Sequence, residues 1–176
     1  TFDFERLELG TANKSNFQRA QEKLQDLKAS RSPAQRSNLI IQQDGRQISE
    51  IKLWTKDRIH AFTLLPERQV ALGSDFVIGI FNADSGQRIR EFEGQTSAVR
   101  ALTASPDHRY LLSGSMDRTL RIWKLDQNQP LLSLFVADND WIAWTPEGYF
   151  AASPGAEQLM GWQVNAGPSK LATFHP

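Results

Sequence analysis

The chain contains no cysteine among its 176 residues, which excludes a disulfide scaffold, a cysteine-based metal site and a cysteine nucleophile within it. It also lacks an apolar run of roughly 18 residues and a signal-peptide pattern, so the sequence predicts neither a membrane span nor export. Lys plus Arg number 20 and Asp plus Glu number 20, which leaves no electrostatic footprint for nucleic acid or an anionic membrane. We expect a cytoplasmic globular protein.

Catalytic motifs are equally scarce. The three histidines, His60, His108 and His175, are far apart, and none has a second ligand at the spacing typical of metal sites. The sequence has no glycine-rich phosphate loop and no Gly-x-Ser-x-Gly elbow. It therefore predicts no metal site, no cofactor and no catalytic residue, and it favours a non-catalytic protein.

What the sequence does contain is a repeat, marked by three prolines. Pro66, Pro106 and Pro146 follow one another at intervals of 40 residues, and short strand-like runs lie between them. A period of about 40–45 residues built from short strands is typical of a β-propeller, in which each period forms one four-stranded antiparallel blade. The sequence therefore predicts an all-β fold.

The middle unit shows the pattern most clearly. Four β-rich runs are separated by turn residues, and the predicted strands are 99–104, 110–115, 119–125 and 131–135. The first turn, from Ser105 to His108, has Ser and Pro where a type I turn prefers them. These runs predict one antiparallel blade.

This unit resembles a WD40 repeat through Ser105-Pro106-Asp107, Ser113-Gly114-Ser115, Asp117-Arg118-Thr119 and Ile122-Trp123. The resemblance implies that Ser113, Asp117 and Trp123 join a buried polar network with a histidine in the loop before the first strand. Here Gln95 replaces that histidine, and Lys124 stands where the second signature residue would be Asp. We expect an incomplete network with a structural role, because unpaired buried polar groups are costly.

The flanking units keep the same register, which gives about 3.5 four-stranded antiparallel blades. We expect a half blade at 37–54, a blade at 55–95, a blade at 96–137 and an atypical terminal blade at 138–176. Closed propellers need about four to eight blades, so this number does not close a ring. We interpret the chain as a fragment of a longer protein. The alternatives are that several chains assemble the ring or that the N-terminal third completes it.

The terminal unit has a motif of its own, Trp141-x-x-Trp144-Thr145-Pro146-Glu147-Gly148-Tyr149 with a later Gly161-Trp162. It resembles a terminal module of bacterial, often cyanobacterial, WD40 proteins whose propeller is joined to a caspase-like peptidase domain. The resemblance implies a cytoplasmic sensor or scaffold that regulates a larger effector. The same motif also closes propellers attached to other effectors or to none. Without cysteine, the chain itself cannot supply the peptidase thiolate.

Residues 1–36 have a different pattern, which predicts an N-terminal strand followed by a helix. Residues 1–9 read as a strand, and an apolar stripe over 15–29 has helical spacing: Phe17, Ala20, Leu24 and Leu27. Ser15 with Gln18 fits a capping box at the start of such a helix. We interpret this segment as a cap or linker docked on the propeller. The alternative is a helix that binds a partner.

The candidate partner-binding face carries the loops at one end of the blades. Its candidates are Asp75 and Phe76, then Met116, and then Asp138 and Asp140. The alternative is that Phe76 and Met116 fold back into their own blades. We predict a platform that binds a protein partner or another part of the same polypeptide. The alternative function is a structural subunit that completes its propeller as a homo-oligomer.

Overall fold

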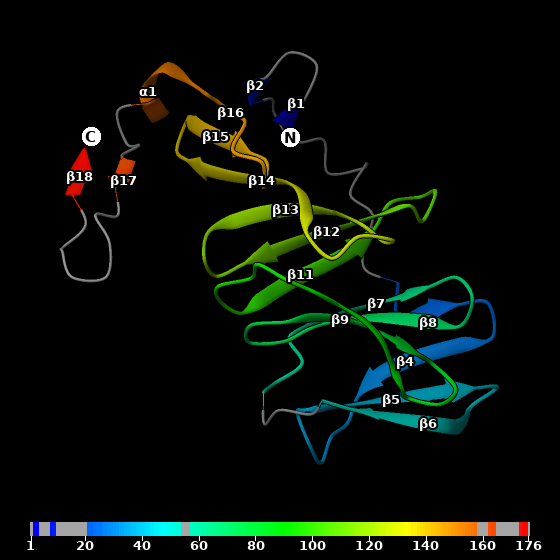
Figure 1. Cartoon of the computed structure of the whole chain (residues 1–176). Coiled ribbons are helices and arrows are strands. Elements are labelled where there is room, and N and C mark those ends of the chain that lie inside the picture. Colours follow the sequence, from blue (N-terminus) through cyan, green and yellow to red (C-terminus); the bar gives the residue numbers. More distant parts are fainter. Residues whose placement is uncertain are drawn as a thin grey trace.

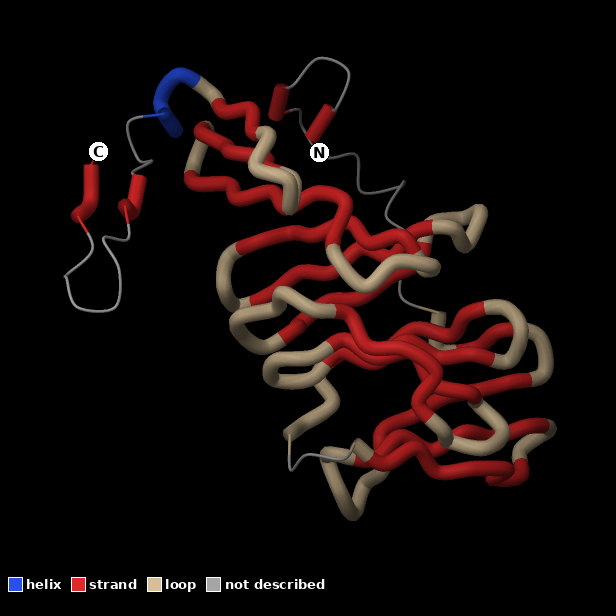
Figure 2. The backbone as a smooth tube through the Cα atoms, viewed as in Figure 1, coloured by secondary structure: helices blue, strands red, loops and turns tan. Residues whose placement is uncertain are grey.

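The computed structural model describes residues 2–3, 8–9, 21–53, 57–157, 162–164 and 173–175. Three antiparallel sheets of four, four and six strands follow one another along the chain and stack face to face (Figure 1). The tube in Figure 2 shows that strands and the turns between them make up almost all of this stack. The predicted all-β fold is confirmed.

The first sheet consists of β3 (Lys23–Leu24), β4 (Leu27–Arg31), β5 (Asn38–Gln43) and β6 (Arg46–Lys52). The predicted half blade at 37–54 is thus the outer half of a complete sheet, whose inner half is supplied by residues 23–31.

The helix predicted over 15–29 is wrong in its described part, because residues 23–24 and 27–31 are strands. Leu27 and Ala29 are buried while Lys28 is exposed, which is the two-residue alternation of a strand. Pairing of Ala29 with Ile41 on β5 gives this segment its backbone partners. Leu24 pairs with Leu27 across a two-residue turn, so the three-residue spacing that predicts a helix is here the spacing across a hairpin. Residues 15–20 lie outside the described residues.

At the N-terminus, β1 (Phe2–Asp3) pairs antiparallel with β2 (Glu8–Leu9). The single continuous strand predicted over 1–9 is therefore wrong, because the chain reverses between these two short strands.

The second sheet consists of β7 (Ala61–Leu65), β8 (Gln69–Gly73), β9 (Ile78–Asn82) and β10 (Arg88–Phe92), and it lies within the blade predicted at 55–95. Both of its faces are covered. Phe62 and Leu64 pack in a cluster with the first sheet, whereas Ala61 and Leu65 pack in a cluster with the third sheet. Burial on both sides explains why β7, β8 and β9 are almost continuously apolar.

The third sheet begins as predicted with β11 (Val99–Ala104), β12 (Tyr110–Ser115), β13 (Thr119–Lys124) and β14 (Pro130–Ala137). It continues with β15 (Asp140–Trp144) and β16 (Phe150–Ala152), after which the chain forms the short helix α1 (Pro154–Glu157). Beyond it, β17 (Trp162–Val164) pairs with β18 (Thr173–His175).

The unit predicted as a terminal blade at 138–176 therefore does not start a sheet of its own. Strand β14 runs on to Ala137, which pairs with Asp140 across a two-residue turn, so β15 and β16 extend the third sheet. A turn this short leaves no linker that could cross to a new blade.

The repeated prolines mark one recurring hairpin turn. Residues Arg68 and His108 both have φ of 54°, and Gly148 has φ of 94°; each lies two positions after a proline of the repeat. The backbone N–H of His108 closes its turn on the carbonyl of Ser105 at 2.9 Å, and Gly148 does the same on Thr145 at 3.0 Å. The 40-residue period is thus the spacing between equivalent hairpins.

The joint between the second and third sheets leaves little room at Gly73. A Cβ atom placed on this residue would lie 2.7 Å from Cγ1 of Val99 on β11. On Gly114, near the end of β12, the closest neighbour would be Cδ2 of Leu120 at 3.4 Å.

We expect Gly73→Ala to lower the free energy of unfolding by about 1–3 kcal/mol, because the added methyl group must push the two sheets apart. Gly114→Ala is the matched control, and its added methyl group makes only an ordinary van der Waals contact. Urea denaturation of both variants measures the difference. Equal losses of stability would contradict a tight joint at Gly73.

Candidate functional site

Two neighbouring hairpins present large apolar side chains to solvent. Phe76, between β8 and β9, is 59% exposed, and Met116, between β12 and β13, is 57% exposed. Neither side chain folds back into its own blade. Their role in partner binding stays a prediction.

A chain of polar contacts connects these two hairpins. Nε2 of His60 lies 2.6 Å from Oδ1 of Asp75, Nδ1 of His60 lies 3.1 Å from Nη1 of Arg100, and Nη2 of Arg100 lies 3.0 Å from Sδ of Met116. Because a guanidinium only donates, Nδ1 of His60 must accept, and its Nε2–H therefore donates to Asp75.

The electrostatics of this contact chain hold Asp75 in its charged form. The hydrogen bond from His60 lowers the pKa of Asp75 below its ordinary value, and partial burial opposes that effect. The backbone N–H of Arg58, 3.3 Å from Oδ2, adds to the lowering. Asp75 thus anchors the imidazole, which in turn orients Arg100.

Sequence reasoning identified Asp75 and Met116 but missed His60 and Arg100. A usable signal was present, because His60 and Arg100 are 40 residues apart, as are Phe76 and Met116. Residues one period apart occupy equivalent places on adjacent blades, and His60 and Arg100 are in contact across the joint.

The remaining candidates, Asp138 and Asp140, lie on the hairpin between β14 and β15. Thr119 pairs with Phe135, and Ala137 pairs with Asp140. This hairpin and the Met116 hairpin therefore lie at the same end of the strands of the third sheet. Asp140, however, accepts a hydrogen bond from Oγ of Ser153 at 2.7 Å. The structure therefore joins Asp75 with Met116, and it ties Asp140 to the segment before α1.

Two of the three predicted network residues are hydrogen-bonded to each other. Nε1–H of Trp123 donates to Oγ of Ser113 at 2.9 Å, and both residues are buried. Nε2 of Gln95 donates to the same oxygen at 2.9 Å. Gln95 thus makes a contact at the position where the resemblance expects histidine.

Asp117 belongs to an adjacent set of contacts. Its carboxylate accepts from the hydroxyl of Thr119 at 2.6 Å, from the hydroxyl of Thr96 at 2.9 Å and from Nη2 of Arg121 at 3.2 Å. Burial raises the pKa of Asp117, but the Thr119 hydroxyl and backbone N–H, the Thr96 hydroxyl and the charge of Arg121 outweigh it, and the pKa is lowered overall. Arg121 also donates to the carbonyl of Gly94, so this set fixes the loop before β11.

We expect Ser113→Ala to cost about 1–3 kcal/mol of stability, because the buried Nε1–H of Trp123 loses its acceptor. Trp123→Phe should cost less in the Ser113→Ala background than in the original chain, since the hydrogen bond is already gone. Urea denaturation of the two single variants and the double variant measures the coupling. Strictly additive losses would contradict a structural role for this pair.

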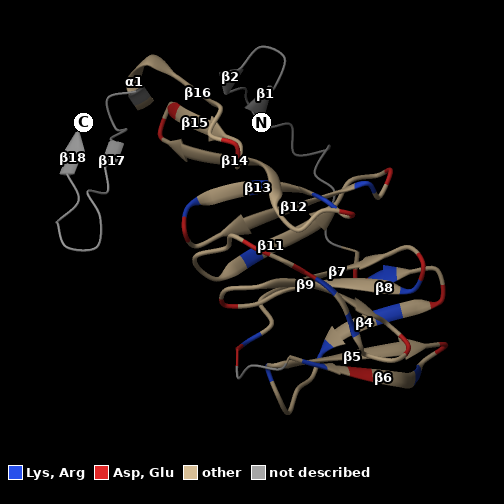
Figure 3. Cartoon of the chain, viewed as in Figure 1, with Lys and Arg blue, Asp and Glu red and all other residues tan. Residues whose placement is uncertain are grey.

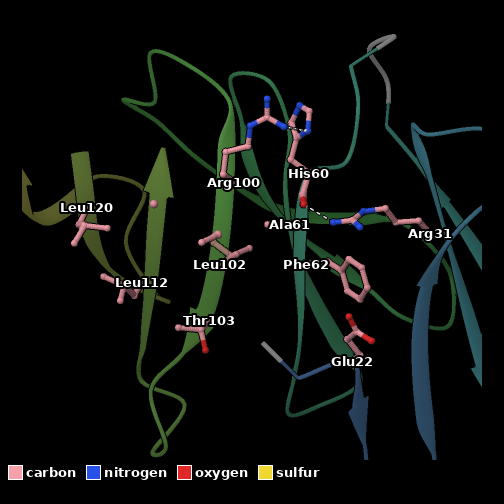
Figure 4. Close-up of a pocket in the computed structure, with 12 residues that line it drawn as sticks. Glu22, Arg31, His60, Ala61, Phe62, Arg100, Leu102, Thr103, Leu112 and Leu120 are labelled. Carbon is pink, nitrogen blue, oxygen red and sulfur yellow. Dashed lines mark hydrogen bonds between the residues drawn. The ribbon is translucent and has the colours of Figure 1, made fainter. Parts of the chain in front are cut away.

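A groove of about 350 Å³ lies beside the same hairpins. Figure 4 shows Leu112 and Leu120 on one side of it, Arg31 and Phe62 on the other, and Arg100 near one end. The strands β7 and β11 run between these two sides, and each is the terminal strand of its sheet.

Elsewhere the charged side chains are dispersed. Figure 3 shows acidic and basic residues mixed along strands, turns and loops, with neither sign gathered on one side. Over the described ranges, no group of three or more His, Cys, Asp or Glu could hold a metal ion. In the same part of the chain, no helix is both long and apolar enough to cross a membrane.

The family model "WD domain, G-beta repeat" matches residues 86–124. This segment runs from just before β10, the outer strand of the second sheet, to the end of β13 in the third sheet. One sequence repeat therefore spans the joint between two blades.

The chain is also similar to parts of several curated proteins. The chain is 36% identical over 126 residues to telomerase protein component 1 of Rattus norvegicus, covering 70% of this chain and 4% of that protein. It is 27% identical over 99 residues to protein hir1 of Schizosaccharomyces pombe, covering 49% of this chain and 10% of that protein. The chain thus spans a small part of these curated relatives.

Solved structures show the same fold. The WD40 β-propeller domain of Doa1 matches with a TM-score of 0.56 at 16% identity, over 72% of this chain and 46% of that one. U3-55K matches with a TM-score of 0.56 at 18% identity, over 72% of this chain and 48% of that one. Residues 86–124 therefore match a WD40 repeat, and the stacked sheets have the fold of part of a WD40-type β-propeller.

Proposed function

We propose that this chain is a non-catalytic platform that binds a protein partner through the hairpins of its second and third sheets. The observation that carries the proposal is the exposure of Phe76 and Met116 at equivalent places on adjacent blades. Large apolar side chains that protrude together into water are typical anchors of protein interfaces. The contact chain from Asp75 to Met116 holds the second anchor in place.

The relatives support an interaction role. The serine-threonine kinase receptor-associated protein of Homo sapiens, as its name says, associates with a receptor, and it is 34% identical to this chain over 68 residues. WD40 repeats in general mediate contacts between proteins, and the matched repeat at 86–124 carries the Met116 hairpin. Another part of the same polypeptide could serve as the partner equally well.

A second part of the proposal concerns the larger protein in which this propeller portion would act. The terminal motif from Trp141 to Tyr149 supports a cytoplasmic regulatory propeller of a larger bacterial effector, with a caspase-like peptidase as its effector domain. The peptidase thiolate would have to come from outside this chain, which has no cysteine. The coding sequence that flanks the chain tests this context: finding no peptidase sequence there would remove it.

We expect the Phe76→Asp/Met116→Asp double variant to lose partner capture and keep its fold, because both anchors are exposed. The immobilised chain would be crosslinked in lysate, and the crosslinked residues would be identified by mass spectrometry. Ile89→Asp is the matched control, since Ile89 is 52% exposed on the outer strand β10. Unfolding of the double variant, or crosslinks that avoid both hairpins, would contradict the proposal.

The alternative function is a structural subunit that completes its propeller by self-assembly. It is favoured by Leu112 and Leu120, which are 39% and 44% exposed on the third sheet. Light scattering at two concentrations tests it, and the alternative expects a stable dimer near twice 19.9 kDa. A monomer at both concentrations would rule it out.

A further inference from the structure

The groove beside the hairpins has an apolar lining. Its walls include Leu112 and Leu120 from the third sheet and Phe62 from the second. The two leucines are 39% and 44% exposed, and they lie on the neighbouring strands β12 and β13 of the third sheet. A bulky aliphatic side chain placed between them would remove this surface from water.

The groove is lined by two arginines, Arg31 and Arg100, and by one acidic residue, Glu22. Among the described residues, no carboxylate forms a salt bridge with Arg100, whose guanidinium contacts the neutral Nδ1 of His60 and the sulfur of Met116. Asp75 reaches Arg100 only through the imidazole of His60.

The second cation, Arg31, is held in a similar way. Its guanidinium donates to the backbone carbonyls of Ile59 and His60, and its charge lies 5.5 Å from the centre of the Phe62 ring. Within the described part of the chain, it too has no carboxylate at salt-bridge distance, and the one acidic residue lining the groove is Glu22. Arginines that keep free donors beside an apolar wall favour a ligand carboxylate.

We propose that the groove binds a peptide segment in which an acidic side chain lies next to a bulky aliphatic one. The carboxylate pairs with Arg100, and the aliphatic side chain packs between Leu112 and Leu120. This inference deepens the proposed platform function and rests on it, because Arg100 also contacts Met116. The leucines distinguish this ligand from a nucleic-acid backbone, whose phosphates would gain nothing from an apolar wall.

The test is selection of a displayed library of randomised peptides on the full chain. We expect the selected peptides to carry Asp or Glu beside Leu, Ile or Met. A fluorescent copy of the most enriched peptide should then bind Arg100→Gln about tenfold more weakly than the original chain, because a charge-assisted hydrogen bond is lost. Leu120→Asp should weaken binding as well, through both lost apolar contact and repulsion of the carboxylate. Arg109→Gln, an exposed arginine on another loop, should change binding less than twofold.

Three outcomes would overturn the inference: enrichment without an acidic bias, equal binding to Arg100→Gln and the original chain, or a second copy of this chain covering the groove so that no peptide is selected. Thermal unfolding of each variant identifies loss of fold, and Arg100→Lys, which keeps the charge, should recover part of the affinity if the variants fold. If the peptide test fails while Phe76 and Met116 still mediate partner capture, the peptide-binding groove is rejected and the proposed platform function is retained.

Discussion

Face-to-face contact between sheets is the constraint on which the rest of this structure depends. The second sheet places Phe62, Leu64 and Leu72 against the first sheet and Ala61, Leu65 and Ile80 against the third. Without either neighbour, half of its apolar residues would face water. The contact between His60 and Arg100 and the groove owe their positions to this stacking, because both bring together residues of different blades.

Much of the fold could be predicted because the turns carry clear signals. Pro66 and Pro106, together with the turn-forming residues beside them, mark hairpins. The β-rich runs between these turns predict strands of the second and third sheets. Two elements could not be assigned in this way. Leu24 and Leu27 have helical spacing in the sequence, but they face each other across a hairpin turn, and pairing of Leu27–Arg31 with β5 holds this segment as a strand. Similarly, the residues around Asp138 suit both a turn within a sheet and a link between sheets.

The candidate site was less predictable, because it depends on which residues meet between blades. Phe76 and Met116 are exposed because the turns that carry them project beyond the packed sheets. The local sequence does not reveal how far a turn projects. Predicting the contact between His60 and Arg100 requires both the 40-residue repeat length and the order in which the sheets stack. Gln95 shows a different limit: its Nε2 donates to Ser113 at the position where the resemblance expects an imidazole, whereas its buried Oε1 has no hydrogen-bond partner among the described residues.

The double burial of the second sheet also has a consequence for the order in which the molecule opens. Strands β8 and β9 each have a hydrogen-bonded strand on both sides and a sheet over each face, so we expect their backbone amides to exchange slowly with solvent. Strand β16 is the terminal strand of the third sheet as described, so its amides have a hydrogen-bonded strand of that sheet on one side only. Stacked arrays of this kind lose structure from their ends inward, since each unit is stabilised chiefly by its neighbours. We therefore expect the middle sheet to open most slowly of the three described sheets.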